Sequence, residues 1–275
     1  MNDRIVHLSD IHYGSPFQQH LEPILLREIA AQRPDLVVLS GDLTQRAKKH
    51  QFQQAQALLD RLPRPYLVIP GNHDVPLYNV FDRLFHSLER YKTYIRPQVD
   101  MVVRAGGMLA VGLNSAHGWT NDRGRISEAQ LQMAQAAFAA ASQAEFKIVV
   151  THHHFVCPPE VHQGPLPKAL LARFAGWGVE LVLTGHTHLS HVEQRPTGLV
   201  LLQSGTATAS RWKKLEKRAN SFNLIAVNAD QIAVQVREYD PVQQDYVPAA
   251  EYTFPRKMRV PGNPAIMDPA HRAQA

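Results

Sequence analysis

The chain has 275 residues, a net charge of +5 with histidine neutral, and a sequence pI of about 9.4. An apolar fraction of 44% suits a globular core and excludes a wholly disordered chain. No apolar run is long enough for a transmembrane helix, and the single cysteine, Cys157, excludes a disulfide within the chain.

We therefore expect a soluble protein of a reducing compartment, the cytoplasm by default, since no apolar leader follows Met1. The positive charge weakly favours anionic partners such as phosphates, nucleic acid or a membrane surface. Lysine and arginine are scattered, so the sequence predicts no nucleic-acid-binding arm.

The first third of the chain alternates between strand-like and helix-like runs. Residues 36–40 (LVVLS) form a continuous apolar run, as expected for a strand buried on both faces. The helical runs show apolar residues at a spacing of three and four. In chain order we predict a strand at 5–9, a helix at 21–32, a strand at 36–40, a helix at 48–62 and a strand at 66–69. This alternation indicates a parallel sheet covered by helices.

The middle of the chain continues the alternation, and the last third does not. We predict a helix at 80–88, strands at 102–103 and 109–113, a helix at 128–141 capped by Ser127, a strand at 147–151, a helix at 166–175 and a strand at 180–184. The runs at 191–195, 199–203, 222–228 and 231–238 are strand-like with no helix between them, which implies a second, more antiparallel sheet.

No linker or repeat divides the chain, so we expect one domain over residues 1–254. Residues 255–275 contain four prolines and few large apolar residues, and we expect them to form a surface tail.

Five polar motifs follow apolar runs at intervals along the chain. They are Asp10-Ile11-His12, Gly41-Asp42, Gly71-Asn72-His73-Asp74, His152-His153-His154 and Gly185-His186-Thr187-His188. Carboxylate, imidazole and amide groups are ligands of divalent metals. Each motif alone is also compatible with an ordinary polar turn. Parallel strands end at one edge of a sheet, so five motifs at strand ends favour a metal site there.

Two of these motifs carry paired ligand types at a spacing of two. Asp10 and His12 form one pair, and His186 and His188 form the other. In an extended segment such residues point to the same side, so each pair can face one or two ions.

The set of motifs resembles the calcineurin-like metallophosphoesterase superfamily, from Ile5 to about Tyr239. The forms Gly41-Asp42-Leu43-Thr44, Gly71-Asn72-His73-Asp74 and Gly185-His186-Thr187-His188 are similar to its bacterial branch of class III cyclic-nucleotide phosphodiesterases and glycerophosphodiesterases. The resemblance implies a four-layer αββα sandwich, in which two mixed β-sheets are flanked by helices. The metal site would lie at the C-terminal ends of the strands.

The resemblance also implies the ligands of two metal ions. One ion would be held by Asp10, His12, Asp42 and His188, and the other by Asp42, Asn72, His152 and His186. His73 would face the substrate phosphate, and Asp74 would orient His73. Relatives commonly have His-His-Pro-Pro where this chain has three histidines, so His153 remains an alternative to His152.

The expected activity is that of a binuclear phosphohydrolase, most simply a phosphodiesterase, using a hydroxide between two ions of Mn, Fe, Zn or Co. Cyclic nucleotides, glycerophosphodiesters and nucleotide-linked lipid precursors are the candidate substrates. Phosphomonoesterase or nuclease activity on the same site is the alternative, although no dedicated nucleic-acid domain is evident. A non-enzymatic scaffold is disfavoured because every ligand position is filled.

Weaker candidates lie in loops. Asn114, His117, Arg123 and Arg125 follow a predicted strand end, where an arginine can hold a phosphate oxygen. A small basic cluster, Arg211, Trp212, Lys213, Lys214, Lys217 and Arg218, is more simply a solvated loop.

Overall fold

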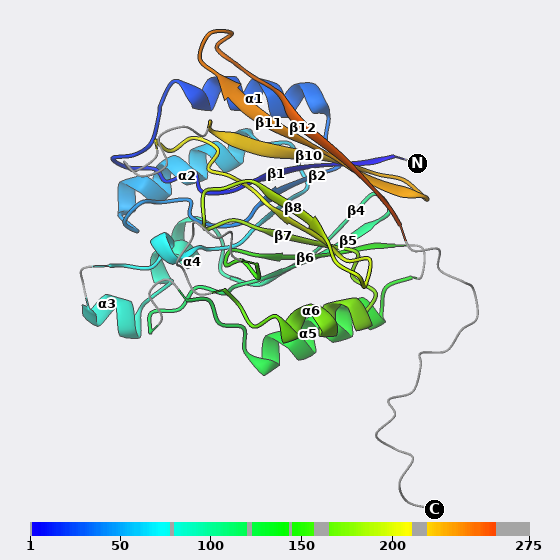
Figure 1. Ribbon diagram of the computed structural model, residues 1–275. Helices are drawn as coiled ribbons and strands as arrows, with labels where there is room; N and C mark the ends of the chain where they lie inside the picture. The colour runs from blue at the N-terminus through cyan, green and yellow to red at the C-terminus, as the bar shows by residue number, and fades with distance from the viewer. Residues whose placement is uncertain are drawn as a thin grey trace, which may run out of the picture.

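Two six-stranded β-sheets lie face to face in the computed structural model of the chain, with helices on their outer sides (Figure 1). The structure describes residues 2–77, 80–119, 123–142, 145–156, 165–210 and 219–256. Helix α1 lies over the first sheet, while α5 and α6 lie against the second at the opposite side of the molecule (Figure 1). The expected four-layer arrangement of two mixed sheets flanked by helices is confirmed.

The first sheet has the strand order β12-β11-β10-β1-β2-β3. Its parallel half is formed by β1 (Asp3–Leu8), β2 (Leu36–Leu39) and β3 (Tyr66–Val68). Its antiparallel half is formed by β10 (Ser221–Val227), β11 (Gln231–Asp240) and β12 (Asp245–Pro255). The parallel strands are connected through α1 (Leu21–Gln32) and α2 (Lys49–Arg61).

The second sheet has the order β4-β5-β6-β7-β9-β8. Its four central strands are parallel, namely β5 (Met108–Leu113), β6 (Phe146–Thr151), β7 (Leu181–Thr184) and β9 (Val200–Gln203). The antiparallel edges are β4 (Met101–Ala105) and β8 (His191–Gln194). The outer helices are α5 (Glu128–Ala139) and α6 (Ala169–Gly176).

The core explains why the central strands are apolar along their whole length. Side chains of both sheets, together with the buried stripe of α2 that includes Phe52 and Leu59, form one apolar cluster. A second cluster fills the space between the second sheet and the pair α5 and α6, around Phe138 and Phe174. Strands buried on both faces read as continuous apolar runs, which is the pattern of residues 36–40.

The structure corrects the expectation that the late strands form a sheet of their own. β10 to β12 extend the first sheet beside β1, and β8 and β9 extend the second beside β7. The helix expected at 80–88 ends earlier, as α3 (Val80–Phe85), and is followed by a further helix that was not expected, α4 (Glu89–Tyr94). β12 was not expected, and Arg256 just beyond it hydrogen-bonds Glu180. Residues 257–275 of the expected tail lie outside the described residues.

Candidate metal centre

The seven residues expected to bind metal all follow parallel strands, at one edge of the two sheets. The first sheet contributes four of them: Asp10 and His12 after β1, Asp42 after β2, and Asn72 after β3. The second sheet contributes three: His152 after β6, and His186 and His188 after β7. The two sheets face each other, so the ends of their parallel strands bring these side chains together.

Four of these side chains form a first donor set. One ligand atom from each of Asp10, His12, Asp42 and His188 lies within 4.8 Å of all the others. Nε2 of His12 and Nε2 of His188 are 2.9 Å apart. Oδ1 of Asp10 lies 3.4 Å from Nε2 of His12 and 3.2 Å from Nε2 of His188. Lone pairs that converge at such separations are the arrangement a cation requires.

A second donor set lies beside the first. Oδ1 of Asn72 is 3.0 Å from Nε2 of His152 and 2.9 Å from Nδ1 of His186. Nε2 of His152 is also 3.4 Å from Oδ2 of Asp42. This second set therefore combines one amide oxygen, two imidazoles and a carboxylate.

Asp42 belongs to both sets. Its Oδ2 lies 3.5 Å from Nε2 of His12 and 3.4 Å from Nε2 of His152. Its other oxygen accepts a hydrogen bond of 2.8 Å from the backbone N–H of His73, which fixes the carboxylate orientation. One oxygen between two donor sets is the geometry of a bridging ligand.

The residues present fit a pair of metal ions. Oδ1 of Asp10 is buried and accepts no hydrogen bond from the described residues, which leaves its lone pairs for a cation. Nδ1 of His152 lies 2.7 Å from the Ser40 carbonyl, and donation there leaves Nε2, which faces Asp42, as the ring atom that can bind a cation in exchange for its proton. Mixed carboxylate, amide and imidazole donors suit divalent transition metals.

Glycines make room for these ligands. A Cβ added to Gly71 would collide with the Asp42 carboxylate, and one added to Gly185 would collide with Ser9 and Asp10. A Cβ on Gly41 would lie 2.5 Å from Nδ1 of His152, and φ of Gly41 is +101°. The glycine of three of the five motifs thus allows the close approach of backbone to ligand.

The electrostatics of the site favour bound positive charge. Burial alone would raise the pKa of Asp42, but the neighbouring imidazoles of His152 and His73 outweigh it and hold that pKa below its usual value. Burial disfavours the imidazolium of His152, yet the charge of Asp42 raises the pKa of His152 to about 9. Burial lowers the pKa of His186 to about 3, which keeps that imidazole neutral and able to coordinate.

The structure distinguishes among the three consecutive histidines. Nε2 of His152 contacts both Asp42 and Asn72. Nδ1 of His153 instead pairs with the Ser115 hydroxyl at 2.8 Å. The ring of His154 stacks on that of His186 with centroids 5.6 Å apart. The geometry thus favours His152 over His153 as the donor.

His73 lies beside the donor sets and does not join them. Its ring centroid is 4.8 Å from that of His12, and its Nδ1 is 3.0 Å from the Gln45 carbonyl. The carboxylate of Asp74 accepts hydrogen bonds from the backbone N–H groups of Gly71, Leu43 and Thr44. Asp74 therefore ties the third motif to the second, while Gln45 faces the imidazole.

A cavity of about 300 Å³ opens directly onto the site, lined by Gln45, Arg46, Asn72, His73, Val75, Leu77 and Arg83. The sequence motifs did not identify Gln45, Arg46, Val75, Leu77 or Arg83 as cavity residues. Of these, Arg46 lies 3.2 Å from Nδ1 of His73. The sequence signal that could have identified Arg46 is its position four residues after Asp42.

The weaker candidates make local contacts. Nε2 of His117 lies 2.9 Å from the Arg125 carbonyl, and Oδ1 of Asn114 accepts the N–H of Ala116. Arg123 is exposed. Cys157 and the basic cluster at 211–218 lie outside the described residues.

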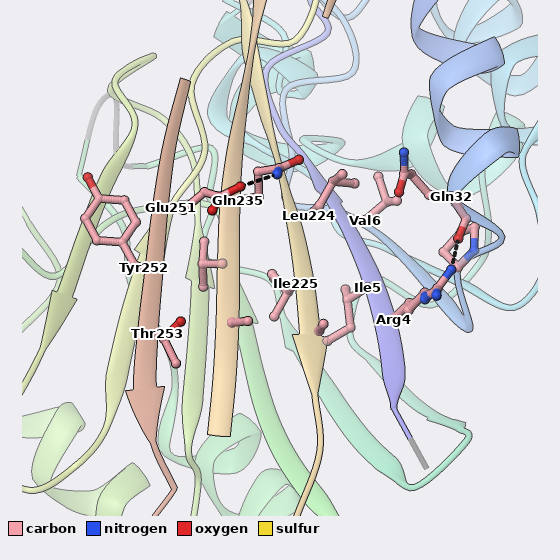
Figure 2. A pocket seen from close by; sticks show the side chains of 14 residues that line it. Arg4, Ile5, Val6, Gln32, Leu224, Ile225, Gln235, Glu251, Tyr252 and Thr253 are labelled. Carbon is pink, nitrogen blue, oxygen red and sulfur yellow. Dashed lines mark hydrogen bonds between the residues drawn. The ribbon is translucent and has the colours of Figure 1, made fainter. Parts of the chain in front are cut away.

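A second cavity, of about 270 Å³, lies on the outer face of the first sheet beside the end of α1 (Figure 2). Leu224 and Val6 form part of its floor, and Gln235 donates a hydrogen bond to Glu251 across it (Figure 2). Its lining includes none of the seven donors. The two cavities are similar in volume, but only the first is lined by one of the candidate metal ligands, Asn72.

None of the helices in the described residues combines the length and apolarity needed to cross a bilayer. Among solved structures, purple acid phosphatase PPD1 from yellow lupin (Lupinus luteus) seeds is similar with a TM-score of 0.73 at 14% identity, over 94% of this chain and 55% of that one. A dimetal phosphatase from Danio rerio is similar with a TM-score of 0.66 at 13% identity, over 92% of this chain and 98% of that one. At these identities the similarity shows the fold alone.

Sequence comparison is more specific. The glycerophosphodiester phosphodiesterase GpdQ of Enterobacter lignolyticus (strain SCF1) is 33% identical over 82 residues, which cover 26% of this chain and 29% of that relative. The matched segment thus spans less than a third of the length of this relative. A sequence profile of the calcineurin-like phosphoesterase family matches residues 3–190, more than half of the chain. The chain therefore belongs to the calcineurin-like phosphoesterase family.

Proposed function

We propose that this phosphoesterase is a binuclear phosphodiesterase. The observation that carries the proposal is the place of Oδ2 of Asp42, within 3.5 Å of a donor nitrogen in each of two sets. One ion would be held by Asp10, His12, Asp42 and His188, and the other by Asp42, Asn72, His152 and His186. Mn, Fe, Zn and Co all suit these ligands.

Two ions bound there would lower the pKa of a water between them and polarise the phosphoryl oxygens. The chain's own contribution is to fix the donors. The N–H of His73 orients Asp42, and the N–H of His186 donates to Oδ2 of Asp10 at 3.0 Å. Asn72 supplies a neutral oxygen in place of a carboxylate. The site therefore carries less negative charge, and metal ions bound there would attract a phosphate anion more strongly.

His73 is the proposed catalytic residue that does not bind metal. Its ring lines the cavity beside Asn72, where the phosphate ester would lie. In its imidazolium form, His73 can donate from Nδ1 to the Gln45 carbonyl and give its Nε2 proton to the leaving oxygen, a contribution of roughly 10²–10⁴-fold. Asp74 acts as a positioning residue, since its carboxylate holds the turn from which His73 projects.

The choice of a diester is supported by the glycerophosphodiester phosphodiesterase relative. Cyclic nucleotides and nucleotide-linked lipid precursors are the other diester classes that we propose. We also propose a cytoplasmic location, which a chain with a single cysteine suits.

The test compares the turnover of bis-p-nitrophenyl phosphate with that of p-nitrophenyl phosphate by the metal-loaded chain. We expect kcat/KM to be higher for the diester, and to fall by about 10²-fold or more in His73→Gln with metal content retained. His50→Gln, at an exposed position on α2, is the matched control. Preference for the monoester would contradict diester specificity, and an unchanged rate in His73→Gln would contradict the role of His73.

A further inference from the structure

Large apolar side chains are exposed around the mouth of the catalytic cavity. Phe81 and Phe85 on α3 are 62% and 66% exposed, Trp119 is 73% exposed, and Leu77 is 43% exposed. The ordinary expectation for aromatic side chains of this size is burial. Three exposed aromatic side chains and one leucine gathered at one place mark an interaction surface.

These side chains form one patch. The rings of Phe81 and Phe85 are in contact, with centroids 5.1 Å apart. Nε of Arg83 donates a 2.8 Å hydrogen bond to the Gly118 carbonyl, which holds the segment carrying Trp119 against α3. We call Leu77, Phe81, Phe85 and Trp119 the aromatic patch; α3 projects from the lower left of the molecule (Figure 1).

The aromatic patch is continuous with the catalytic cavity. Leu77 belongs to both, and Arg83, between the two phenylalanines, also lines the cavity. The same cavity wall includes Asn72 and His73. A surface that covers the aromatic patch would therefore lie against the mouth through which substrate enters.

Exposed basic residues lie on the same side of the molecule. Arg90 of α4 donates a hydrogen bond of 2.9 Å to the Ala47 carbonyl, so the start of α2 with its exposed Lys48 and Lys49 lies next to α4. The chain as a whole carries a net charge of +5. Exposed aromatic side chains beside basic ones are the composition of proteins that bind anionic lipid surfaces.

We propose that the aromatic patch inserts into an anionic lipid surface and presents the catalytic cavity to phosphodiesters held there. The proposal rests on the proposed function for its substrate class, but the docking itself does not require catalysis. Four side chains are few for the roughly 800 Å² per partner that a stable dimer buries. A lipid surface needs no such area, because each inserted side chain contributes separately.

The test is co-sedimentation of the full chain with vesicles of phosphatidylcholine alone and of phosphatidylcholine mixed with phosphatidylglycerol. We expect binding to the anionic vesicles that weakens as salt is raised. Phe81→Ser/Phe85→Ser should lower the partition coefficient by about tenfold or more. Val242→Ser, at a 90% exposed position in the β11–β12 hairpin, is the matched control and should bind as the natural chain does.

Equal binding by the double variant would overturn the proposal, and so would absence of binding by the natural chain. A dimer that becomes monomeric in the double variant, without vesicle binding, would instead make the patch an interface between copies. Turnover of soluble bis-p-nitrophenyl phosphate is followed separately. Absence of that turnover in a natural chain that binds the vesicles would contradict the proposed function and leave the docking surface in place.

Discussion

Five of the seven candidate ligands have left-handed backbone conformations. φ is 56° at Asp10, 56° at His12 and 53° at Asp42, and it is 77° at His186 and 60° at His188. Non-glycine residues at such angles cost of order 1–3 kcal/mol each and persist only where the surroundings hold them. Here the N–H of Asp10 donates to the Gly41 carbonyl and that of His12 to the Asp42 carbonyl. Neighbouring motifs therefore hold each other in the conformation that coordination needs.

The clearance at Gly71 gives the first prediction. Gly71→Ala forces a methyl group against the Asp42 carboxylate, so we expect weaker metal binding and kcat/KM lower by about 10-fold or more. The matched control is Gly176→Ala in α6, where an added Cβ meets nothing within 4 Å. It should bind metal normally, with stability equal or higher by up to about 1 kcal/mol. Equal metal affinity in the two variants, measured by titration, would contradict the role given to Gly71.

The buried His7 gives a prediction about pH. Burial lowers the pKa of His7 to about 3, against a partly opposing effect of Asp10. The unfolded chain takes up this proton near pH 6.5 and the folded chain does not, so His7 favours folding above pH 6.5 and this contribution is lost as pH falls toward 3. In His7→Gln the free energy of unfolding should fall less steeply over that range in urea titrations. An identical slope in both proteins would show that His7 is protonated when folded.

At the scale of elements, continuous apolar runs made the parallel strands predictable. The run at 36–40 became β2, and the motif after it lies at the strand end as expected. Pairing partners were not predictable, because nothing local in β10 indicates that it joins β1 across more than 200 residues. The short α4 and the largely exposed β12 lack a clear period and were missed.

The motifs predicted that these seven side chains follow strand ends at one edge of the sheets, but they did not predict the backbone conformation there. An extended segment was the expected reason that Asp10 and His12 face the same side. Their positive φ values show two left-handed residues instead. The choice between His152 and His153 required the Ser115 and Asn72 contacts, which come from distant parts of the chain.

Helix α5 allows a prediction at this scale. Ser127 accepts a hydrogen bond from the N–H of Gln130, whose side chain accepts one from the N–H of Ser127. Ser127→Ala removes one half of this capping box and should lower the free energy of unfolding by about 1 kcal/mol. Urea denaturation measures the change. A loss below a few tenths of a kcal/mol would mean that the cap is replaced by solvent.

At the scale of the whole molecule, the site joins the two sheets. Asp10, Asp42 and Asn72 come from the first sheet, and His152 and His186 come from the second. Bound ions would therefore bridge the sheets as well as support chemistry. The same edge carries the aromatic patch, so the proposed lipid contact and the proposed chemistry lie on one end of the molecule.

Metal removal tests this link between site and stability. An ion that binds only the folded chain stabilises it by about 2.7 kcal/mol at a free concentration of about 100 Kd. We expect chelation to lower Tm by roughly 5–10 °C and to abolish diester turnover, with both restored by added Mn²⁺ or Zn²⁺. A Tm that is unchanged by chelation, with full loss of metal, would contradict a bridge between the sheets.

The most direct measurement is the metal content per chain of the purified protein and three variants. We expect about two ions in the natural chain, about one in His152→Ala, fewer than one in Asp42→Asn, and about two in His153→Ala. Circular dichroism confirms that each variant is folded. Two ions retained in Asp42→Asn would contradict the sharing of Asp42 between two metal ions. Ions lost in His153→Ala and kept in His152→Ala would contradict the choice of His152 as the donor.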